Sequence, residues 1–264
     1  MLSMKPAEKP MSARELTALR SRLLARIHRR FVTVTETHAA GPLRLAFTRV
    51  ADPDVVLDQI VEKEDLREKL TGNRRDGNDL HLPYWAELWD SALGIGIQIV
   101  EGGEWRVEGK KVHSPRSTLH APPLSVLDLG CGMGFTGMVA AAMGANVLLA
   151  DLEADALLFA QLNTLRWHDR VRTRRLNWQT DRLTESFDLI IGADVLYDRT
   201  QWDYLDPFFR AHLRPEGSIL LGEPGRQTGD LFPDWITKRG WKLRHLEQRV
   251  PTRDKPIRIF RLSA

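Results

Sequence analysis

The sequence Val-Leu-Asp-Leu-Gly-Cys-Gly-Met-Gly at residues 126–134 decides the fold class. Its apolar start is typical of a buried strand, and its alternating glycines allow a sharp turn into a helix that begins near Phe135. A second apolar run, residues 146–150, leads directly into Asp151, which follows the turn by about 20 residues. A strand, a glycine turn, a helix and a following carboxylate together bind the ribose of a nucleoside. The segment therefore predicts a nucleoside-cofactor site.

Two cofactors compete for this turn, because its glycines can be framed in two ways. Residues 132–137 match the dinucleotide pattern G-x-G-x-x-G, whereas residues 130–134 headed by Asp128 match the first motif of the seven-strand methyltransferases. A carboxylate at Asp128 would repel a pyrophosphate but attract the ammonium and sulfonium of S-adenosyl-L-methionine. We therefore predict S-adenosyl-L-methionine as the cofactor. The residues expected to bind it here are Asp128, Gly130, Gly132, Gly134 and Asp151.

Composition narrows the class of protein. The chain has 264 residues, of which 42% are hydrophobic, enough for one substantial α/β core. The net charge of +3 is small and does not demand a nucleic-acid partner. Cys131 is the only cysteine, which excludes an internal disulfide and fits a reducing compartment. No apolar stretch reaches the length of a membrane span, and no signal-peptide pattern is found, so we expect a cytoplasmic protein without membrane contact.

The first third of the chain is expected to precede the catalytic domain. We predict a disordered tail over residues 1–11, an extension with a helix and a β-hairpin over 12–80, and a methyltransferase domain over 81–264. The finer expectations are a helix over 12–30, hairpin strands near 31–35 and 43–50, a short helix over 53–60, a mobile polar loop over 67–79, a helix over 84–100 and an insertion over 102–123.

From Ser125 onward, short apolar strands alternate with helices. This alternation predicts a parallel sheet that helices cover on both faces. The last two candidate strands, 241–250 and 256–262, are separated only by a short turn and must therefore be antiparallel. The predicted fold is α/β, a Rossmann-like, mostly parallel sheet of seven strands with an antiparallel last strand. The other strands are expected at 125–129, 146–150, 171–176, 187–193 and 217–222, with helices near 135–143, 153–167, 200–213 and 229–239.

A second group of polar residues follows the fourth strand of the predicted sheet. Ala193-Asp194-Val195-Leu196-Tyr197 lies at its carboxyl end, which is where ligands bind in open α/β sheets. Asp194 and Tyr197 should therefore face the same crevice as the glycine turn and orient the nucleophile. The structural alternative is that Asp194 caps the helix near Thr200 while Tyr197 is half-buried in packing.

Four motifs together resemble methyltransferase family 16, the seven-strand protein lysine methyltransferases. They are Trp89-Asp90-Ser91-Ala92, residues 128–134, Leu176-Asn177-Trp178 and Asp194-x-x-Tyr197. Residues 82–89 and Gly222-Glu223-Pro224-Gly225-Arg226 further resemble the branch that methylates the β-subunit of electron transfer flavoprotein. The resemblance covers residues 80–262. The insertion over 102–123 departs from it, so the resemblance does not predict the substrate rim at that place.

The resemblance implies roles for individual residues. Asp194 and Tyr197 match the substrate-side motif, Trp89 matches a tryptophan that contacts the cofactor, and Asn177 and Trp178 match residues beside adenine. An indole can also stack on a purine, which agrees for Trp178. Ala193, which precedes Asp194, is placed on the cofactor side. Packing on an apolar helical stripe is the alternative for Trp89 and the preferred reading for Trp85.

The acceptor is less constrained than the cofactor. We expect a lysine of a protein, possibly a flavoprotein subunit by resemblance, and a monomeric enzyme; a small amine or RNA as acceptor, and a binding module without turnover, are the alternatives. The basic segment 166–175 is interpreted as a solvated face rather than a nucleic-acid site. The histidines lack metal-ligand spacing, so we predict no metal site.

Overall fold

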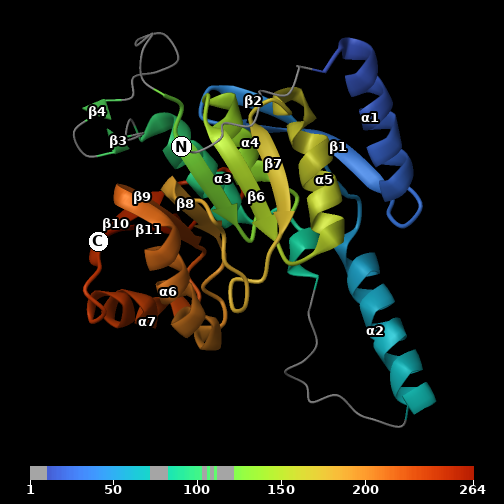
Figure 1. The fold of residues 1–264 in the computed structure, drawn as a ribbon. Helices are drawn as coiled ribbons and strands as arrows, with labels where there is room; N and C mark the ends of the chain where they lie inside the picture. Colours follow the sequence, from blue (N-terminus) through green and yellow to red (C-terminus); the bar gives the residue numbers. More distant parts are fainter. Residues whose placement is uncertain (1–10, 72–82, 103–105, 108–109, 112–121) are drawn as a thin grey trace.

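A seven-stranded sheet forms the centre of the protein in a computed structural model, which describes residues 11–71, 83–102, 106–107, 110–111 and 122–264 (Figure 1). The strand order is β10-β11-β9-β8-β5-β6-β7. All neighbours pair in parallel except β11, which is antiparallel to both β9 and β10. Six strands therefore run one way and only β11 runs the other. The predicted fold class is confirmed, including the antiparallel end of the chain.

The predicted core elements lie within a few residues of the observed ones. The strands of the sheet are β5 (Ser125–Leu129), β6 (Asn146–Asp151), β7 (Val171–Arg175), β8 (Phe187–Ala193), β9 (Leu213–Glu223), β10 (Lys242–Gln248) and β11 (Ile257–Ser263). The helices beside it are α3 (Asp90–Glu101), α4 (Phe135–Ala142), α5 (Ala154–Thr164), α6 (Trp202–His212) and α7 (Gln227–Thr237), with short 3-10 turns at Leu165–Trp167 and Arg199–Gln201.

Alternating side chains of the strands pack into two separate hydrophobic cores. In β5, Val126 belongs to the core under α3, α4 and α5, whereas its neighbour Leu127 belongs to the core under α6 and α7. Leu189 and Ile190 of β8 divide in the same way. A parallel sheet covered on both faces requires this pattern, because successive side chains point to opposite faces. The carboxyl ends of the parallel strands all lie at the same end of the sheet.

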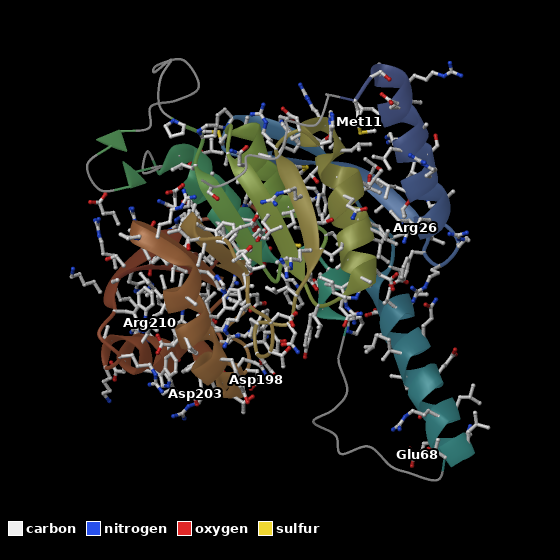
Figure 2. All side chains as sticks on the ribbon, in the orientation of Figure 1. Met11, Arg26, Glu68, Asp198, Asp203 and Arg210 are labelled. Carbon is white, nitrogen blue, oxygen red and sulfur yellow. The ribbon has the colours of Figure 1, made fainter. Side chains whose placement is uncertain are left out.

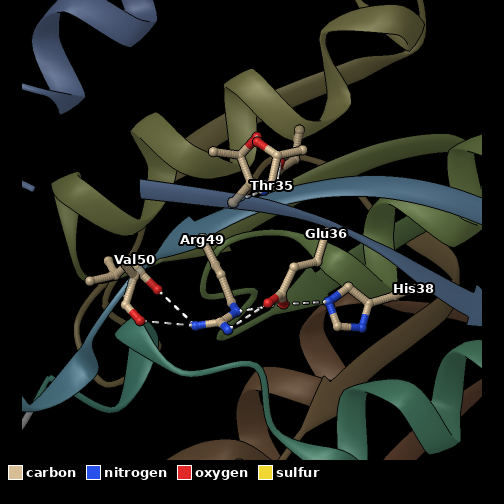
Figure 3. A network of polar contacts seen from close by, with 8 residues as sticks. Thr35, Glu36, His38, Arg49 and Val50 are labelled. Atoms are coloured by element: carbon tan, nitrogen blue, oxygen red, sulfur yellow. Dashed lines mark hydrogen bonds and ion pairs between the residues drawn. The ribbon is translucent and has the colours of Figure 1, made fainter. Parts of the chain in front are cut away.

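The N-terminal elements form an outer layer over α3, α4 and α5. They are α1 (Ala13–Ile27) and the hairpin of β1 (Thr33–Ala40) and β2 (Leu43–Val50). Phe47 packs edge-on against Phe135 of α4, with 5.5 Å between ring centroids. On the polar face of the hairpin, Arg49 forms a two-point ion pair with Glu36, at 2.9 and 3.0 Å, and also bonds to the Val50 carbonyl (Figure 3).

One predicted helix is much longer than expected. The helix that begins at Pro53 does not end at Ile60 but continues as α2 to Thr71, so the first residues of the predicted loop 67–79 are helical. Residues 61–71 are rich in Glu, Lys, Leu and Arg, which are strong helix formers, and a charged helix of this kind was mistaken for a loop. The helix projects from the body and ends close to Glu68 (Figures 1 and 2). The rest of that loop and the predicted tail up to residue 10 lie outside the described residues.

The predicted helix over 84–100 was also wrong at its start. Residues Tyr84–Ala86 form a single 3-10 turn, the chain is extended at Glu87 and Trp89, and α3 begins at Asp90. The indole N–H of Trp89 donates to the Tyr84 carbonyl at 2.7 Å, which occupies the acceptor that a continuous helix would need there. Trp89 therefore does not belong to an apolar helical stripe, whereas Trp85 is buried in the core as expected.

Of the insertion over 102–123, the described part includes the two-residue strands β3 (Arg106–Val107) and β4 (Lys110–Lys111). Within the described residues, no helix combines the length and apolarity needed to cross a membrane.

A single buried amide links the hairpin to the glycine turn. Asn163 of α5 accepts a bond from the Thr48 N–H at 2.8 Å and donates to the carbonyls of Thr48 and Met133, both at 2.9 Å. Asn163→Ala would leave three buried backbone groups unpaired. We expect a loss of about 3 kcal/mol or more in the free energy of unfolding, measured by urea denaturation.

Gln161, on the same helix, provides the matched control. It is half-buried and makes one bond, to the Thr173 hydroxyl at 2.7 Å. Gln161→Ala should lower the free energy of unfolding by about 1 kcal/mol or less. Equal losses for the two variants would contradict the role given to Asn163.

Candidate active site

The glycine turn lies between the carboxyl end of β5 and the start of α4. The N–H groups of Gly130 and Cys131 both donate to the Ala150 carbonyl, at 2.8 and 3.0 Å, which holds the turn against β6. Gly130 has a φ of 66°, in the left-handed region, and a Cβ there would lie 3.0 Å from Val195 and 3.6 Å from the Trp178 ring. The turn therefore needs glycine for both its conformation and its closeness to neighbouring side chains.

Asp128 lies beneath the turn and is almost completely buried. Its carboxylate accepts the Gly137 N–H of α4 at 2.7 Å. Burial is the main cause that raises its pKa to about 7, against the lowering effect of that bond and with a further rise from the nearby Asp151. A buried carboxylate with this pKa is poorly compensated by the protein alone, so a cation beside it would be favoured.

Asp151, the last residue of β6, is held by two backbone donors. Its carboxylate oxygens accept the N–H groups of Gly132 at 2.8 Å and Glu153 at 2.9 Å. Burial raises the pKa of this carboxyl to about 6. The Leu152 N–H also lowers this pKa slightly. A carboxylate can accept about four hydrogen bonds, so Asp151 can accept a further donor.

A cavity of about 500 Å³ opens at this edge of the sheet. It brings together residues from β5, β6 and β8, from the segment after β7 and from the segment before α3. Gly134, also predicted to bind the cofactor, precedes α4 as its N-cap at a φ of 86°, packs against Ala160 and is not part of the lining. The sequence-predicted site residues that line the cavity are Trp89, Asp128, Gly130, Gly132, Asp151, Asn177, Trp178, Ala193, Asp194 and Tyr197.

Asn177 and Trp178 lie in a folded loop beyond β7. The Asn177 side chain accepts the Gln179 N–H at 3.0 Å, and the backbone N–H of Asn177 donates to the Asp181 carboxylate at 2.9 Å. The Trp178 indole N–H donates to the Gln201 side chain at 3.2 Å. These bonds fix the indole beside Gly130, on the lining of the cavity.

Asp194 is not free at the end of β8. The Arg226 guanidinium donates to both of its carboxylate oxygens, at 3.0 and 2.6 Å. The alternative role of a helix cap also fails for Asp194, because Asp198 accepts the Thr200 N–H and caps the 3-10 turn. Sequence reasoning missed Arg226 as a site residue. Its position just after β9, next to the end of β8, was the available signal.

Two tyrosines flank the mouth of the cavity. Tyr197 and Tyr84 are 40% and 43% exposed, and their ring centroids are 5.2 Å apart. Burial of part of the ring and several nearby carboxylates raise the pKa of Tyr197, so its phenol stays protonated at neutral pH. It can donate a hydrogen bond but cannot act as a base there. Within the described ranges, no group of three or more His, Cys, Asp or Glu side chains is arranged to hold a metal ion.

The protein-family comparison assigns the chain to a family. Residues 86–232 match the family model for lysine methyltransferases. The chain belongs to this lysine methyltransferase family. The match spans the glycine turn and the Asp194 segment, and it ends before β10, so most of the described cavity lies within it.

Individual relatives of this family member share about 30% identity. The chain is 31% identical over 144 residues to protein N-lysine methyltransferase METTL21A of Xenopus tropicalis, covering 52% of this chain and 58% of the relative. It is 29% identical over 177 residues to the electron transfer flavoprotein beta subunit lysine methyltransferase of Xenopus laevis, covering 62% and 58%. It is 30% identical over 146 residues to EEF1A lysine methyltransferase 3 of Mus musculus, covering 53% and 56%. The aligned part thus spans under two thirds of each relative.

The raised pKa of Asp128 predicts how stability depends on pH. A carboxyl whose pKa rises from 3.8 in the unfolded chain to about 7 in the folded protein binds protons more tightly when folded. The free energy of unfolding of the cofactor-free protein should therefore fall as the pH rises through that window, by up to about 1.4 kcal/mol per pH unit for one group. Urea denaturation at several pH values measures this slope.

Asp128→Asn should reduce the dependence, since an amide cannot titrate; the raised pKa of Asp151 leaves a smaller slope in the variant. The variant should gain stability relative to the wild type as the pH rises between about 5 and 7. Asp188→Asn is a control, since Asp188 is a strand carboxylate paired with Arg214 outside the cavity. An unchanged slope in Asp128→Asn would contradict the assignment.

Proposed function

We propose that the protein transfers a methyl group from S-adenosyl-L-methionine to the side-chain amine of a lysine in another protein. The observation that carries the proposal is that one cavity combines Asp128, Asp151 and the glycine turn with Asp194 and Tyr197. The first set suits the cofactor, and the second lies where an acceptor would enter. Both sets fall largely within the matched lysine methyltransferase segment.

The residues of the cavity fit the proposed cofactor. Asp151 lines the cavity as a carboxylate held by backbone donors, which suits the hydroxyls of a ribose. Asp128 offers a negative charge to an ammonium or sulfonium. Trp178 and Asn177 would lie beside adenine, and Trp89 and Ala193 would complete the contacts. When bound, the cofactor supplies a methyl group on a positively charged sulfur, which an uncharged amine can accept.

The remaining task of the site is to present an uncharged lysine. A lysine in water has a pKa of about 10.4 and carries no lone pair while protonated. Loss of water in the cavity lowers that pKa, so a strong base is not required. Tyr197 stays protonated and can donate a hydrogen bond, and Asp194 can accept one from the amine. Both residues would act by holding the amine in line.

The elements around the cavity mouth suit a protein acceptor. The rings of Tyr84 and Tyr197 are partly exposed to solvent. The pKa of Glu87 is raised by burial, by Asp90 and, to a smaller extent, by Asp54, which places the start of α2 near this rim. We propose that residues 12–80 form an extension that shapes this rim, and that the domain over 81–264 acts as a monomer in the cytoplasm. The β-subunit of electron transfer flavoprotein is the first acceptor to test, because one relative bears its name.

Labelling of cell extract tests the class of acceptor. The protein is incubated with methyl-labelled cofactor and extract from its source, and portions are treated with protease or nuclease. The label should be lost to protease and should resist nuclease, and the purified flavoprotein β-subunit should be labelled as well. A label lost to nuclease alone, or found only in small molecules, would overturn the proposal.

A further inference from the structure

The ion pair between Asp194 and Arg226 is fixed from both sides. Asp194 has a φ of 55°, its N–H donates to the Gly222 carbonyl at 2.9 Å, and its side chain is only 5% exposed. Arg226 contacts both carboxylate oxygens. A two-point pair of this kind sets the direction as well as the charge of the carboxylate.

Glu223 holds the segment that carries Arg226. This buried carboxylate, at the end of β9, accepts the N–H groups of Gly225, at 2.8 Å, and of Arg226. The Arg258 guanidinium of β11 donates to Glu223 at 2.6 Å and to the Arg226 carbonyl at 3.1 Å. At Gly229, a Cβ would lie 2.5 Å from the Glu223 carboxyl carbon, so a side chain there would disturb the arrangement.

The array of Asp194, Arg226, Glu223 and Arg258 is not explained by its contribution to stability alone. Buried ion pairs lose hydration that their attraction often fails to repay, and apolar residues of similar volume are often as stabilising. Its end point is the guanidinium of Arg226, which lies 5.4 Å from the Trp89 ring centre and lines the cavity. The array therefore places one positive charge at the acceptor side of the site.

The positive charge of Arg226 lies in a cavity lined by several carboxylates. Among the described residues that line the cavity, Arg226 is the only Lys or Arg. The other titratable side chains of the lining come from the segment before α3, from β5, β6 and the residues that follow them, and from the loop after β8. They are Tyr84, Glu87, Asp128, Cys131, Asp151, Glu153, Asp194, Tyr197 and Asp198. Behind Arg226, β9 contributes Glu223, β11 contributes Arg258, and α7 contributes Asp230, which pairs with Arg258.

We propose that Arg226 is a positioning residue for methyl transfer, which orients the Asp194 carboxylate and balances its charge so that the acceptor lysine reaches the site as an uncharged amine. The inference rests on the proposed function. A carboxylate without a counter-ion favours the protonated form of a nearby amine, whereas a paired one does so far less. The pair can thus hold the amine by a hydrogen bond without keeping its proton in place.

The pH dependence of transfer tests this role. In Arg226→Gln, kcat near neutral pH should fall about 30-fold, and the pH of half-maximal kcat should rise by about one unit. Arg226→Lys keeps the charge but loses the two-point contact, so it should restore the pH midpoint while kcat remains reduced. Both variants are assayed with the protein that the wild type labels in extract. Cofactor affinity, measured by calorimetry, should change by less than about threefold, since the cofactor carboxylates are untouched.

Arg239→Gln is the matched control. Arg239 also lies over an indole, 3.7 Å from the Trp235 ring centre, and also pairs with an aspartate, Asp203 at 2.8 Å, but it is not part of the cavity lining. Its kcat and pH midpoint should match the wild type. A higher rate in Arg226→Gln, or a loss with no shift of the midpoint, would overturn the inference alone. A wild type that labels no lysine would overturn the proposed function and the inference with it.

Discussion

Replacing Asp194 with alanine should abolish methyl transfer, with a fall in kcat of about 100-fold or more. Under the proposed function, this carboxylate aligns the acceptor amine, and the ion pair with Arg226 fixes its direction. Its removal leaves the amine without a partner that aligns it. Cofactor affinity should stay within a few-fold, because Asp128 and Asp151 lie on other strands. Rapid-quench kinetics and calorimetry measure the two quantities separately.

Asp203→Ala controls for the loss of a carboxylate paired with arginine. Asp203 pairs with Arg239 at the surface and is 70% exposed. Its loss should leave both kcat and affinity close to the wild type. Equal losses of transfer and cofactor binding in Asp194→Ala would show that Asp194 belongs to the cofactor side, contrary to its assignment.

Replacing Asp151 with alanine should have the opposite effect, a large loss of cofactor affinity with a smaller loss of kcat. The variant loses the proposed acceptor for two ribose hydroxyls and also the bond from the Gly132 N–H. Hydrogen bonds to a charged group contribute about 1.5–3 kcal/mol each, so cofactor affinity should fall about 100-fold or more. Calorimetric titration with S-adenosyl-L-methionine measures this, and kcat at saturating cofactor should fall much less than affinity.

Asp169→Ala is the corresponding control for Asp151. Asp169 is an exposed carboxylate paired with Arg170, away from the cavity lining. Its affinity for the cofactor should equal that of the wild type. Unchanged affinity in Asp151→Ala would remove the main argument for a nucleoside at this turn.

Local patterns predicted the parts of the fold that depend on near neighbours. The glycine turn at 130–134 and the alternating strands follow from glycine conformations and from burial on both faces of a sheet. The antiparallel end of the chain followed from the short turn between the last strands. Such features need no knowledge of distant contacts, and the structure confirms them.

The features that sequence patterns did not predict depend on contacts between particular side chains and groups elsewhere in the chain. The helix α3 begins only at Asp90, and the Trp89 indole bonds the Tyr84 carbonyl across the extended residues before it, a contact that the helical spacing of apolar residues does not reveal. The pair of Asp194 and Arg226 joins residues 32 positions apart, and that separation carries no local signal. The pair forms because β8 and β9 are neighbours in the sheet, which brings the ends of the two strands together.

Peptide mapping by mass spectrometry tests the central claim most directly. The acceptor protein is incubated with deuterated-methyl cofactor and either the wild type or Asp194→Ala, then digested and sequenced. The proposal predicts a labelled methyl group on the side-chain nitrogen of a lysine with the wild type and none above background with the variant. A label on another residue type, or equal lysine labelling by the variant, would contradict the account.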